Sequence, residues 1–295
     1  MNRLSATAAF NQFSAEDEIE YEVQVEEPYE VFDEEDSSED DQEEPVLPVH
    51  PYFHSFRDES LSINPAPEDE DYGKAATSYE EDVYTKEDPI VIKGSGKDPD
   101  SPYSKAHYKE MKALLKERVK PTRFKHSVSV AKTAKLMAKA YGVDPDMAKM
   151  AGLLHDWDKA LSDEELRDRV DTYGIELDPY MVENMPWLLH GYTGAAALMD
   201  THPEFDHALY QAIARHTLGA PNMSKLDMII YVADKIEPGH FVPVYQELYK
   251  HIGQMDLFDL YFAVQRENLS YLIDSERPLN LDAVKVWNHC VNLRS

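Results

Sequence analysis

Six histidine and aspartate side chains in residues 101–295 have the types and placement of metal ligands. A helix rich in apolar residues ends in His155 and Asp156, and both side chains can reach one ion from the carboxyl-terminal end of that helix. The second carboxylate oxygen of Asp156 can then bridge to a second ion. The six candidates are His126, His155, Asp156, His190, His216 and Asp234.

The other four candidates occupy positions that we expect to face a helical core. His126 and His216 are each in line, at a spacing of four residues, with small or apolar residues of the same predicted helix. Asp234 lies on an otherwise apolar helix, where a carboxylate is costly unless it is paired or bound to a cation. Each residue alone would be interpreted as a hydrogen-bonded core residue. Their convergence in one domain predicts a centre for a divalent transition metal.

The ligand types are compatible with several metals and exclude a zinc site built from several cysteines. Imidazole and carboxylate together suit iron, manganese, zinc, nickel or cobalt. The single cysteine, Cys290, excludes a multi-cysteine zinc site and an internal disulfide framework, and we interpret it as a buried small side chain. A chain with one cysteine, without an apolar stretch of about 20 residues and without an apolar leader core is expected to be cytoplasmic, with no membrane partner.

The charge of the chain is strongly negative and unevenly distributed. The 57 Asp and Glu against 29 Lys and Arg give a net charge of -28, which disfavours nucleic acid and anionic lipid as partners. Residues 1–100 carry 30 acidic and 6 basic side chains, whereas residues 101–295 carry 27 and 23. We therefore predict a disordered acidic tail over 1–100. Within it, residues 19–25 alternate apolar and polar, which leaves open that the tail adds a strand to a protein partner.

Residues 101–295 are predicted to fold as one all-α domain, a helical bundle without strands. Apolar spacing and capping residues predict helices over 105–119, from Pro121 to Gly142, from Pro145 to Leu154, from Ser162 to Gly174, and over 191–201, 205–216, 224–236, 256–275 and 281–293. We interpret Trp157 and Trp187 as core residues of this bundle, with stacking on an adenine as the alternative.

The order of His126, His155-Asp156 and Asp234 resembles that of HD-domain metal-dependent phosphohydrolases. Five phrases narrow the resemblance to the YqeK family, the bacterial symmetrical bis(5'-nucleosyl)-tetraphosphatases. They are Arg123-Phe124-Lys125-His126-Ser127, the run from Ala151 to Lys159, Leu188-Leu189-His190-Gly191, His216-Thr217-Leu218-Gly219 and the run from Ala233 to Pro238. The resemblance extends from about residue 105 to the carboxyl terminus and leaves the acidic third uncovered.

The resemblance implies a helical HD fold that holds iron or a similar metal, as one or two ions, and cleaves diadenosine tetraphosphate into two ADP. It implies His126, His155, Asp156 and Asp234 as the primary metal ligands. His190 and His216 would serve a second metal or the polyphosphate. We expect Asp156 to position the attacking water, and Lys159 and Arg123 to stabilise the phosphoryl oxygens.

The resemblance also implies contacts to the nucleotide and its phosphates. The expected residues are Arg123, His126, Lys159, His190, His216, Thr217 and His240. At His240 the sequence departs from the family, which typically has an arginine there. A permanent planar cation is thereby replaced by a group that is only partly charged at neutral pH, which bears on phosphate affinity and on the pH dependence of activity.

Two other functions stay open at this point. One is an HD-domain phosphohydrolase that acts on a different nucleotide, such as a nucleoside monophosphate or a cyclic dinucleotide. The other is an interaction protein whose acidic tail binds a basic partner, with residues 101–295 as its scaffold. The sequence also leaves open whether the chain forms a homodimer.

Overall fold

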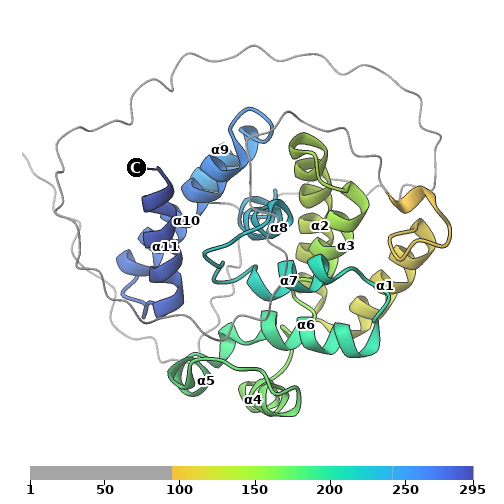
Figure 1. The fold of residues 1–295 in the computed structure, drawn as a ribbon, viewed down its shortest axis with the longest axis horizontal. Helices are drawn as coiled ribbons and strands as arrows, with labels where there is room; N and C mark the ends of the chain where they lie inside the picture. The colour runs from red at the N-terminus through yellow and green to blue at the C-terminus, as the bar shows by residue number, and fades with distance from the viewer. Residues whose placement is uncertain (1–94, 241, 295) are drawn as a thin grey trace, which may run out of the picture. The chain divides into compact units, whose positions relative to one another are not determined.

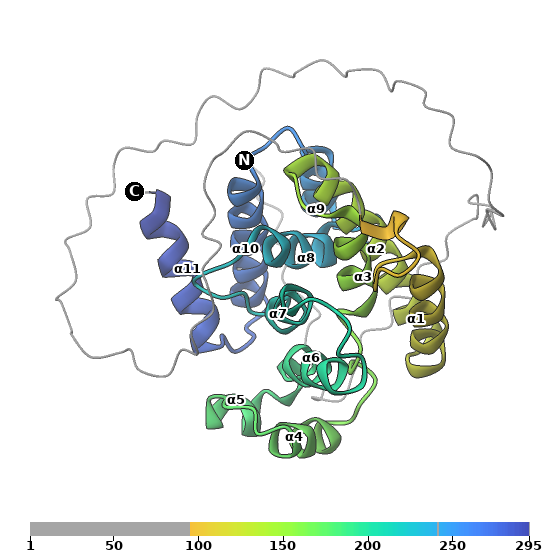
Figure 2. The same cartoon turned by 45° about the vertical axis from the view of Figure 1, so that its right-hand side comes forward.

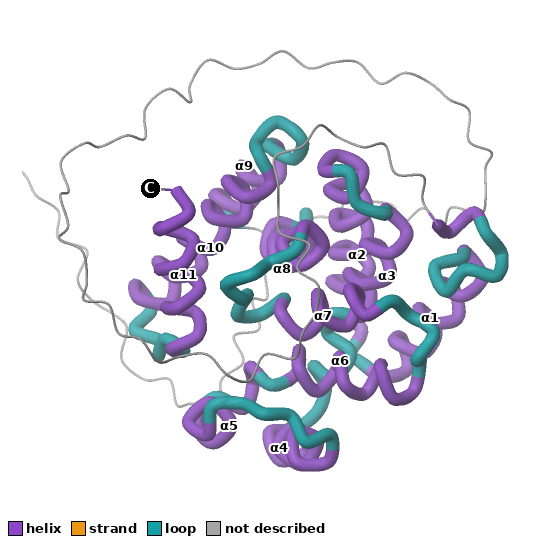
Figure 3. The backbone as a smooth tube through the Cα atoms, viewed as in Figure 1, coloured by secondary structure: helices purple, strands orange, loops and turns teal. Residues whose placement is uncertain are grey.

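The computed structural model describes residues 95–240 and 242–294, and these residues form helices joined by loops, with no strand among them (Figure 3). The elements in chain order are η1 (Ser95–Lys97), α1 (Lys105–Arg118), α2 (Pro121–Tyr141), α3 (Pro145–Leu154), α4 (Asp163–Thr172), α5 (Pro179–Asn184), η2 (Pro186–Leu188), α6 (His190–Thr201), α7 (His207–Arg215), α8 (Lys225–Ile236), α9 (Pro243–Lys250), α10 (Leu257–Asp274) and α11 (Leu281–Arg294). The predicted all-α fold is confirmed.

The helices begin and end where the capping residues indicated. Ser162 with Glu165 and Ser224 with Asp227 form the capping boxes that open α4 and α8, each side chain bonding to the other residue's backbone N–H. Gly142 ends α2 with φ at 70°, in the left-handed region that a glycine adopts without strain. Local sequence therefore sets the limits of the helices that carry the candidate ligands.

Helix α8 lies in the centre of the described bundle. Ten of its twelve residues are buried, so its apolar composition is that of a helix enclosed on all sides. Figures 1 and 2 both show α8 between α2 and α3 on one side and α10 on the other. Asp234, in the last turn of α8, is therefore delivered to the interior of the bundle, where it contacts His126 of α2 and His155, the residue directly after α3.

Helices α2 and α3 approach each other closely because α3 carries a glycine at the contact. A Cβ atom added to Gly152 would lie 3.0 Å from the Cα of Ala131 and 3.1 Å from the carbonyl oxygen of Val130, both backbone atoms of α2. The backbone of α2 cannot yield as a flexible side chain does. Gly152 thus sets the separation of the two helices that carry His126 and His155.

We expect Gly152→Ala to lower the free energy of unfolding by about 1 kcal/mol, since overpacking exceeds the gain in helix propensity. Gly194→Ala on α6 is the matched control, because its added Cβ would lie an ordinary 3.4 Å from the Cβ of Trp157. That variant should be neutral or up to about 1 kcal/mol more stable. Urea denaturation of both variants measures the difference, and equal stabilities would contradict the close approach.

Two short helices, α5 and α9, were not predicted. Each buries a single side chain, Met181 in α5 and Tyr245 in α9, so neither shows the apolar periodicity of an enclosed helix. The prediction of helices over 256–275 and 281–293 is confirmed to within one residue at each end.

The predicted tail, residues 1–100, lies outside the described residues except for its last six, and so does the alternating segment 19–25. Residues Ser95–Lys97 form η1, where the backbone N–H groups of Ser95 and Gly96 donate to the carboxylates of Asp144 and Asp146. The described structure thus begins six residues before the predicted domain boundary. None of the helices in residues 95–240 and 242–294 has the length and apolar character needed to cross a membrane.

Candidate metal centre

The structure brings all six predicted ligands into one cluster inside the bundle. The side chains come from five places in the fold: His126 from α2, His155 and Asp156 from the turn after α3, His190 from the start of α6, His216 from the end of α7 and Asp234 from α8. Five of the six residues are less than 9% exposed, and the His126 side chain is 13% exposed. The cluster therefore lies largely out of water.

Three of the imidazoles are held by the backbone so that their Nε2 atoms face the cluster. The Nδ1 atom of each ring lies close to the backbone carbonyl three residues earlier, at 2.8 Å for His155 and 2.7 Å for both His190 and His216. Because a carbonyl only accepts, each Nδ1 must carry the proton and donate it. In its neutral form, each ring therefore presents an Nε2 lone pair to the interior, where a proton or a metal ion can bind it.

These lone pairs converge in a way that suits a bound cation. The Nε2 atoms of His190 and His216 are 3.1 Å apart, and they lie 3.2 and 3.7 Å from Oδ1 of Asp156. The Nε2 of His155 is buried and has no hydrogen-bond partner among the described residues. Imidazole nitrogens and carboxylate oxygens without protons between them repel one another, and a metal ion at their centre removes that repulsion. The residues present therefore fit a metal.

The carboxylate of Asp156 separates the cluster into two groups of ligand atoms. Its Oδ2 lies 3.2 Å from Nε2 of His155 and 3.9 Å from Nε2 of His126. Oδ1 of Asp234 completes this group at 3.0 Å from His126 and 3.4 Å from His155. Oδ1 of Asp156 instead faces the His190 and His216 pair. A carboxylate with one oxygen in each group has the placement of a bridge between two ions.

The electrostatics of the cluster also favour a cation. Burial opposes ionisation of Asp156 and Asp234, but neighbouring His155 and Lys235 respectively hold the pKa of each carboxyl well below its usual range. Burial lowers the pKa of His155, and the two carboxylates outweigh it and raise that pKa to about 10. Burial lowers the pKa of His190 to about 4. Two ionised carboxylates in the interior need positive charge beside them, which a divalent ion supplies.

Two residues of the site, Glu237 and Lys235, were not among the predicted ones. Glu237 is 3% exposed and accepts a hydrogen bond from Nδ1 of His126 at 3.2 Å. This contact fixes the orientation of the His126 ring, so that its Nε2 faces Asp234. Carboxylates that accept a hydrogen bond from a metal-binding histidine commonly orient the ring in this way. Lys235 pairs through its ammonium group with the outer oxygen of Asp234. The signal in the sequence that could have indicated both residues is the run of charged side chains that follows Asp234.

The predicted phosphate and nucleotide contacts lie beside the cluster. The guanidinium of Arg123 donates to Oδ2 of Asp156 at 3.0 Å. The hydroxyl of Thr217 is 3.1 Å from Nε2 of His216, and the ring of His240 is 6.0 Å from that of His126. Lys159 is partly buried, and burial lowers the pKa of its ammonium group against the opposing effect of Asp156.

The two tryptophans differ in environment. Trp157 is 7% exposed and its ring lies under the guanidinium of Arg118 at 4.7 Å, so its core interpretation is confirmed. Trp187 is 49% exposed, so its core interpretation is wrong. In its short 3-10 helix, η2, Leu188 packs against a second group of buried residues that includes Met181 and Leu189, while the indole of Trp187 stays exposed. Cys290 is 2% exposed, as predicted for a buried small side chain.

The turn that carries His155 and Asp156 is held by a buried carboxylate that follows it. Asp158 is fully buried and accepts hydrogen bonds from Arg118 at 2.7 Å and from Arg169 at 2.9 and 2.8 Å. The Nε of Arg118 also donates to the carbonyl of Trp157 at 2.6 Å. These bonds tie the turn to α1 and α4 and so position the two ligands.

We expect Asp158→Asn to lower the free energy of unfolding by about 2 kcal/mol, because both arginines lose a charged acceptor and the buried amide cannot replace it. Urea denaturation measures this loss. Asp168→Asn, at an exposed position of α4, is the matched control and should change stability by less than about 0.5 kcal/mol. A loss no larger than in the control would show that Asp158 does not hold the turn.

Comparisons with known proteins agree with this geometry. A model of the HD domain family matches residues 123–239. A protein of Bacillus subtilis named bis(5'-nucleosyl)-tetraphosphatase, symmetrical, is 28% identical over 183 residues, which cover 62% of this chain and 97% of the relative. A Mycoplasma genitalium protein named probable nicotinate-nucleotide adenylyltransferase/Ap4A hydrolase is 38% identical over 126 residues, 42% of this chain and 34% of that one.

A solved structure is similar over the same region. It is a crystal structure from Clostridium acetobutylicum, described as a predicted HD superfamily hydrolase involved in NAD metabolism. The two chains are 32% identical with a TM-score of 0.59, and the match covers 63% of this chain and 97% of the other.

Proposed function

Because the chain belongs to the HD superfamily of hydrolases, we propose that it cleaves diadenosine tetraphosphate and related dinucleoside tetraphosphates symmetrically to two nucleoside diphosphates. The observation that carries the proposal is the buried cluster of four imidazoles and two carboxylates, in a chain that spans 97% of a relative named for this activity. The proposal places the activity in residues 101–295.

The cluster would hold one or two divalent transition-metal ions. His126, His155, Asp234 and Oδ2 of Asp156 would bind the first. His190, His216 and Oδ1 of the same Asp156 would bind the second or face the polyphosphate. Mixed nitrogen and oxygen ligands support iron, the metal that the family resemblance implies, and are also compatible with manganese, zinc, nickel or cobalt.

When bound, such an ion polarises phosphoryl oxygens and lowers the pKa of water towards neutrality. Asp156 would orient the attacking water towards an inner phosphorus. The new bond joins the water oxygen to that phosphorus, and the bond to the oxygen between the two inner phosphates breaks. Arg123 and Lys159, both beside Asp156, would neutralise the charge that develops on the phosphoryl and leaving oxygens.

The test is to measure the metal content of the purified full chain and to incubate the metal-loaded protein with diadenosine tetraphosphate. Ion-exchange chromatography separates the products. Two ADP per substrate, with a transition metal bound, is the expected result. ATP with AMP would mean cleavage of the anhydride between an outer and an inner phosphate and would contradict symmetrical cleavage. No turnover by the metal-loaded protein would contradict the substrate.

A further inference from the structure

The two histidines of the second group of ligand atoms lie at a junction between α6 and α7. His190 is the first residue of α6, and His216 directly follows Arg215, the last residue of α7. Their Nε2 atoms are 3.1 Å apart, and both face Oδ1 of Asp156. The carbonyl that holds each ring belongs to the ring's own segment. The separation of the two rings therefore depends on what holds the two helices together.

A glycine lets α6 approach α7 closely at this junction. Gly191 follows His190, and a Cβ atom added to it would lie 3.1 Å from the carbonyl oxygen of Ile213 and 3.3 Å from that of Ala214. It would also lie 3.3 Å from Cε1 of the His216 ring. Both carbonyls belong to the backbone of α7, and that of Ile213 also holds the His216 ring at 2.7 Å. A larger residue at position 191 would therefore push His190 and His216 apart.

A buried carboxylate of α8 holds the end of α7. Asp227 lies in the first turn of α8 and is fully buried. Its Oδ2 accepts a hydrogen bond from Nη1 of Arg215 at 2.9 Å and another from Nε2 of Gln211, one turn earlier in α7, at 3.0 Å. The same Nη1 donates to the carbonyl of Asn222 at 2.8 Å. A charged acceptor with two donors from α7 thus fixes the residue directly before His216.

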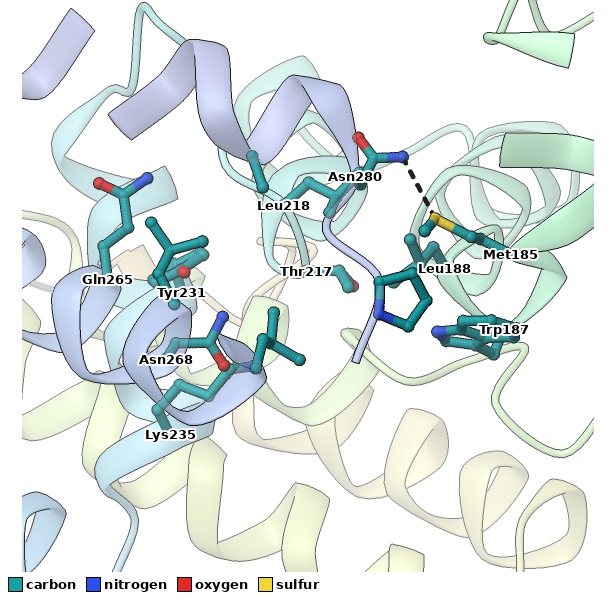
Figure 4. Close-up of a pocket in the computed structure, with 14 residues that line it drawn as sticks. Met185, Trp187, Leu188, Thr217, Leu218, Tyr231, Lys235, Gln265, Asn268 and Asn280 are labelled. Carbon is teal, nitrogen blue, oxygen red and sulfur yellow. Dashed lines mark hydrogen bonds between the residues drawn. The ribbon is translucent and has the colours of Figure 1, made fainter. Parts of the chain in front are cut away.

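The segment that follows His216 is less firmly supported. Thr217 and Leu218 line a cavity of about 150 Å³, whose other walls come from η2, α8, α10 and the chain that leads into α11 (Figure 4). Because side chains do not fill the space on this side, packing there restrains the end of α7 only weakly. The contacts of α7 with Gly191 and Asp227 are therefore the main restraints on the position of His216.

We propose that Gly191 and Asp227 are positioning residues that set the distance between His190 and His216, and that they thereby determine whether the centre holds a second ion. The inference rests on the metal centre of the proposed function. Neither Gly191 nor Asp227 supplies a ligand atom. Changing either residue should weaken the binding of the second ion and leave the first ion in place.

The test is to count the Mn²⁺ ions that the purified full chain binds in equilibrium dialysis, without substrate. The wild type should bind two ions per chain. Gly191→Ala should keep the first ion and bind the second about 10- to 100-fold more weakly, the effect expected when a group that orients a ligand is changed. Gly194→Ala on the same helix is the matched control, because its added Cβ would make only an ordinary contact of 3.4 Å. It should bind two ions.

Asp227→Ala tests the other restraint. It removes the acceptor of Arg215 and Gln211, so it should weaken the second ion by a similar factor. Asp144→Ala is the matched control, because Asp144 also caps the start of a helix, α3, and should leave both ions bound. Circular dichroism shows whether each variant is folded. If Asp227→Ala does not fold, the result for Gly191→Ala decides.

The electron paramagnetic resonance of Mn²⁺ provides a readout that is independent of activity. Two ions about 4 Å apart, bridged by Asp156, couple their electron spins, whereas a single ion gives the spectrum of an isolated ion. At the lowest Mn²⁺ concentration that saturates the wild type, the coupled signal should appear in the wild type and both controls. It should be absent from Gly191→Ala and Asp227→Ala.

Two coupled ions in Gly191→Ala or in folded Asp227→Ala at that concentration, or a single ion in the wild type, would overturn the inference. Failure of the proposed function is distinguishable, because no substrate is present in these measurements. It would appear as absent turnover of diadenosine tetraphosphate in a wild type that binds its ions.

Discussion

Asp156→Ala should lower the turnover of diadenosine tetraphosphate by about a thousandfold or more while the protein stays folded. The reason is the position of this carboxylate between the two groups of ligand atoms. Its Oδ2 serves the His126 and His155 side, and its Oδ1 serves the His190 and His216 side. Removing it deprives both metal positions of a ligand and the attacking water of its orienting group. Ion-exchange chromatography of the products measures the loss.

Two further variants separate chemistry from folding in this experiment. Asp156→Asn keeps the size of the side chain and removes its charge, and it should lose activity nearly as completely. Asp168→Ala, at an exposed position of α4, should retain wild-type turnover. Circular dichroism of each variant checks the helical content. If Asp156→Ala kept more than a few per cent of wild-type turnover, the assignment of Asp156 to the reaction would be wrong.

The positions of the six candidate ligands could be anticipated from sequence because each is a polar residue on or next to an apolar helix. Burial then follows from helical spacing, as for His126 on α2 and Asp234 on α8. The same local rules set helix limits, since capping boxes such as that of Ser162 act within one turn. Patterns within one or two helical turns were therefore sufficient to predict both the fold class and the candidate site.

The features that sequence did not reveal depend on where loops place side chains. Glu237 follows the last residue of α8, and only the turn to Gly239, whose N–H donates to Oε2 of Glu237 at 2.6 Å, brings its carboxylate behind His126. The exposure of Trp187 depends likewise on how η2 ends the segment before α6. Neither α5 nor α9 buries enough side chains to give a periodic signal.

Glu237→Gln should weaken metal binding about 10- to 100-fold. The Glu237 carboxylate accepts the Nδ1 proton of His126, and this bond fixes the ring so that Nε2 faces Asp234. A carboxylate in that place also makes the ligating nitrogen more basic, which a neutral amide cannot do. Burial raises the pKa of Glu237, but the hydrogen bond from His126 and other contacts outweigh it and hold that pKa below its ordinary value. The side chain is therefore charged, and Glu237→Gln removes that charge. Competition with a chelator measures the metal affinity.

This loss should be reversible by metal, which distinguishes it from damage to the fold. At saturating metal the Glu237→Gln protein should recover most of the wild-type turnover, since the ligand atoms themselves are intact, whereas Asp156→Ala should not recover. Glu183 is an exposed carboxylate in α5, so Glu183→Gln is the control for the loss of one negative charge. This variant should bind metal as the wild type does. Wild-type metal affinity in Glu237→Gln would show that the His126 ring is held without its carboxylate partner, and the orienting role would then fall to Asp234 alone.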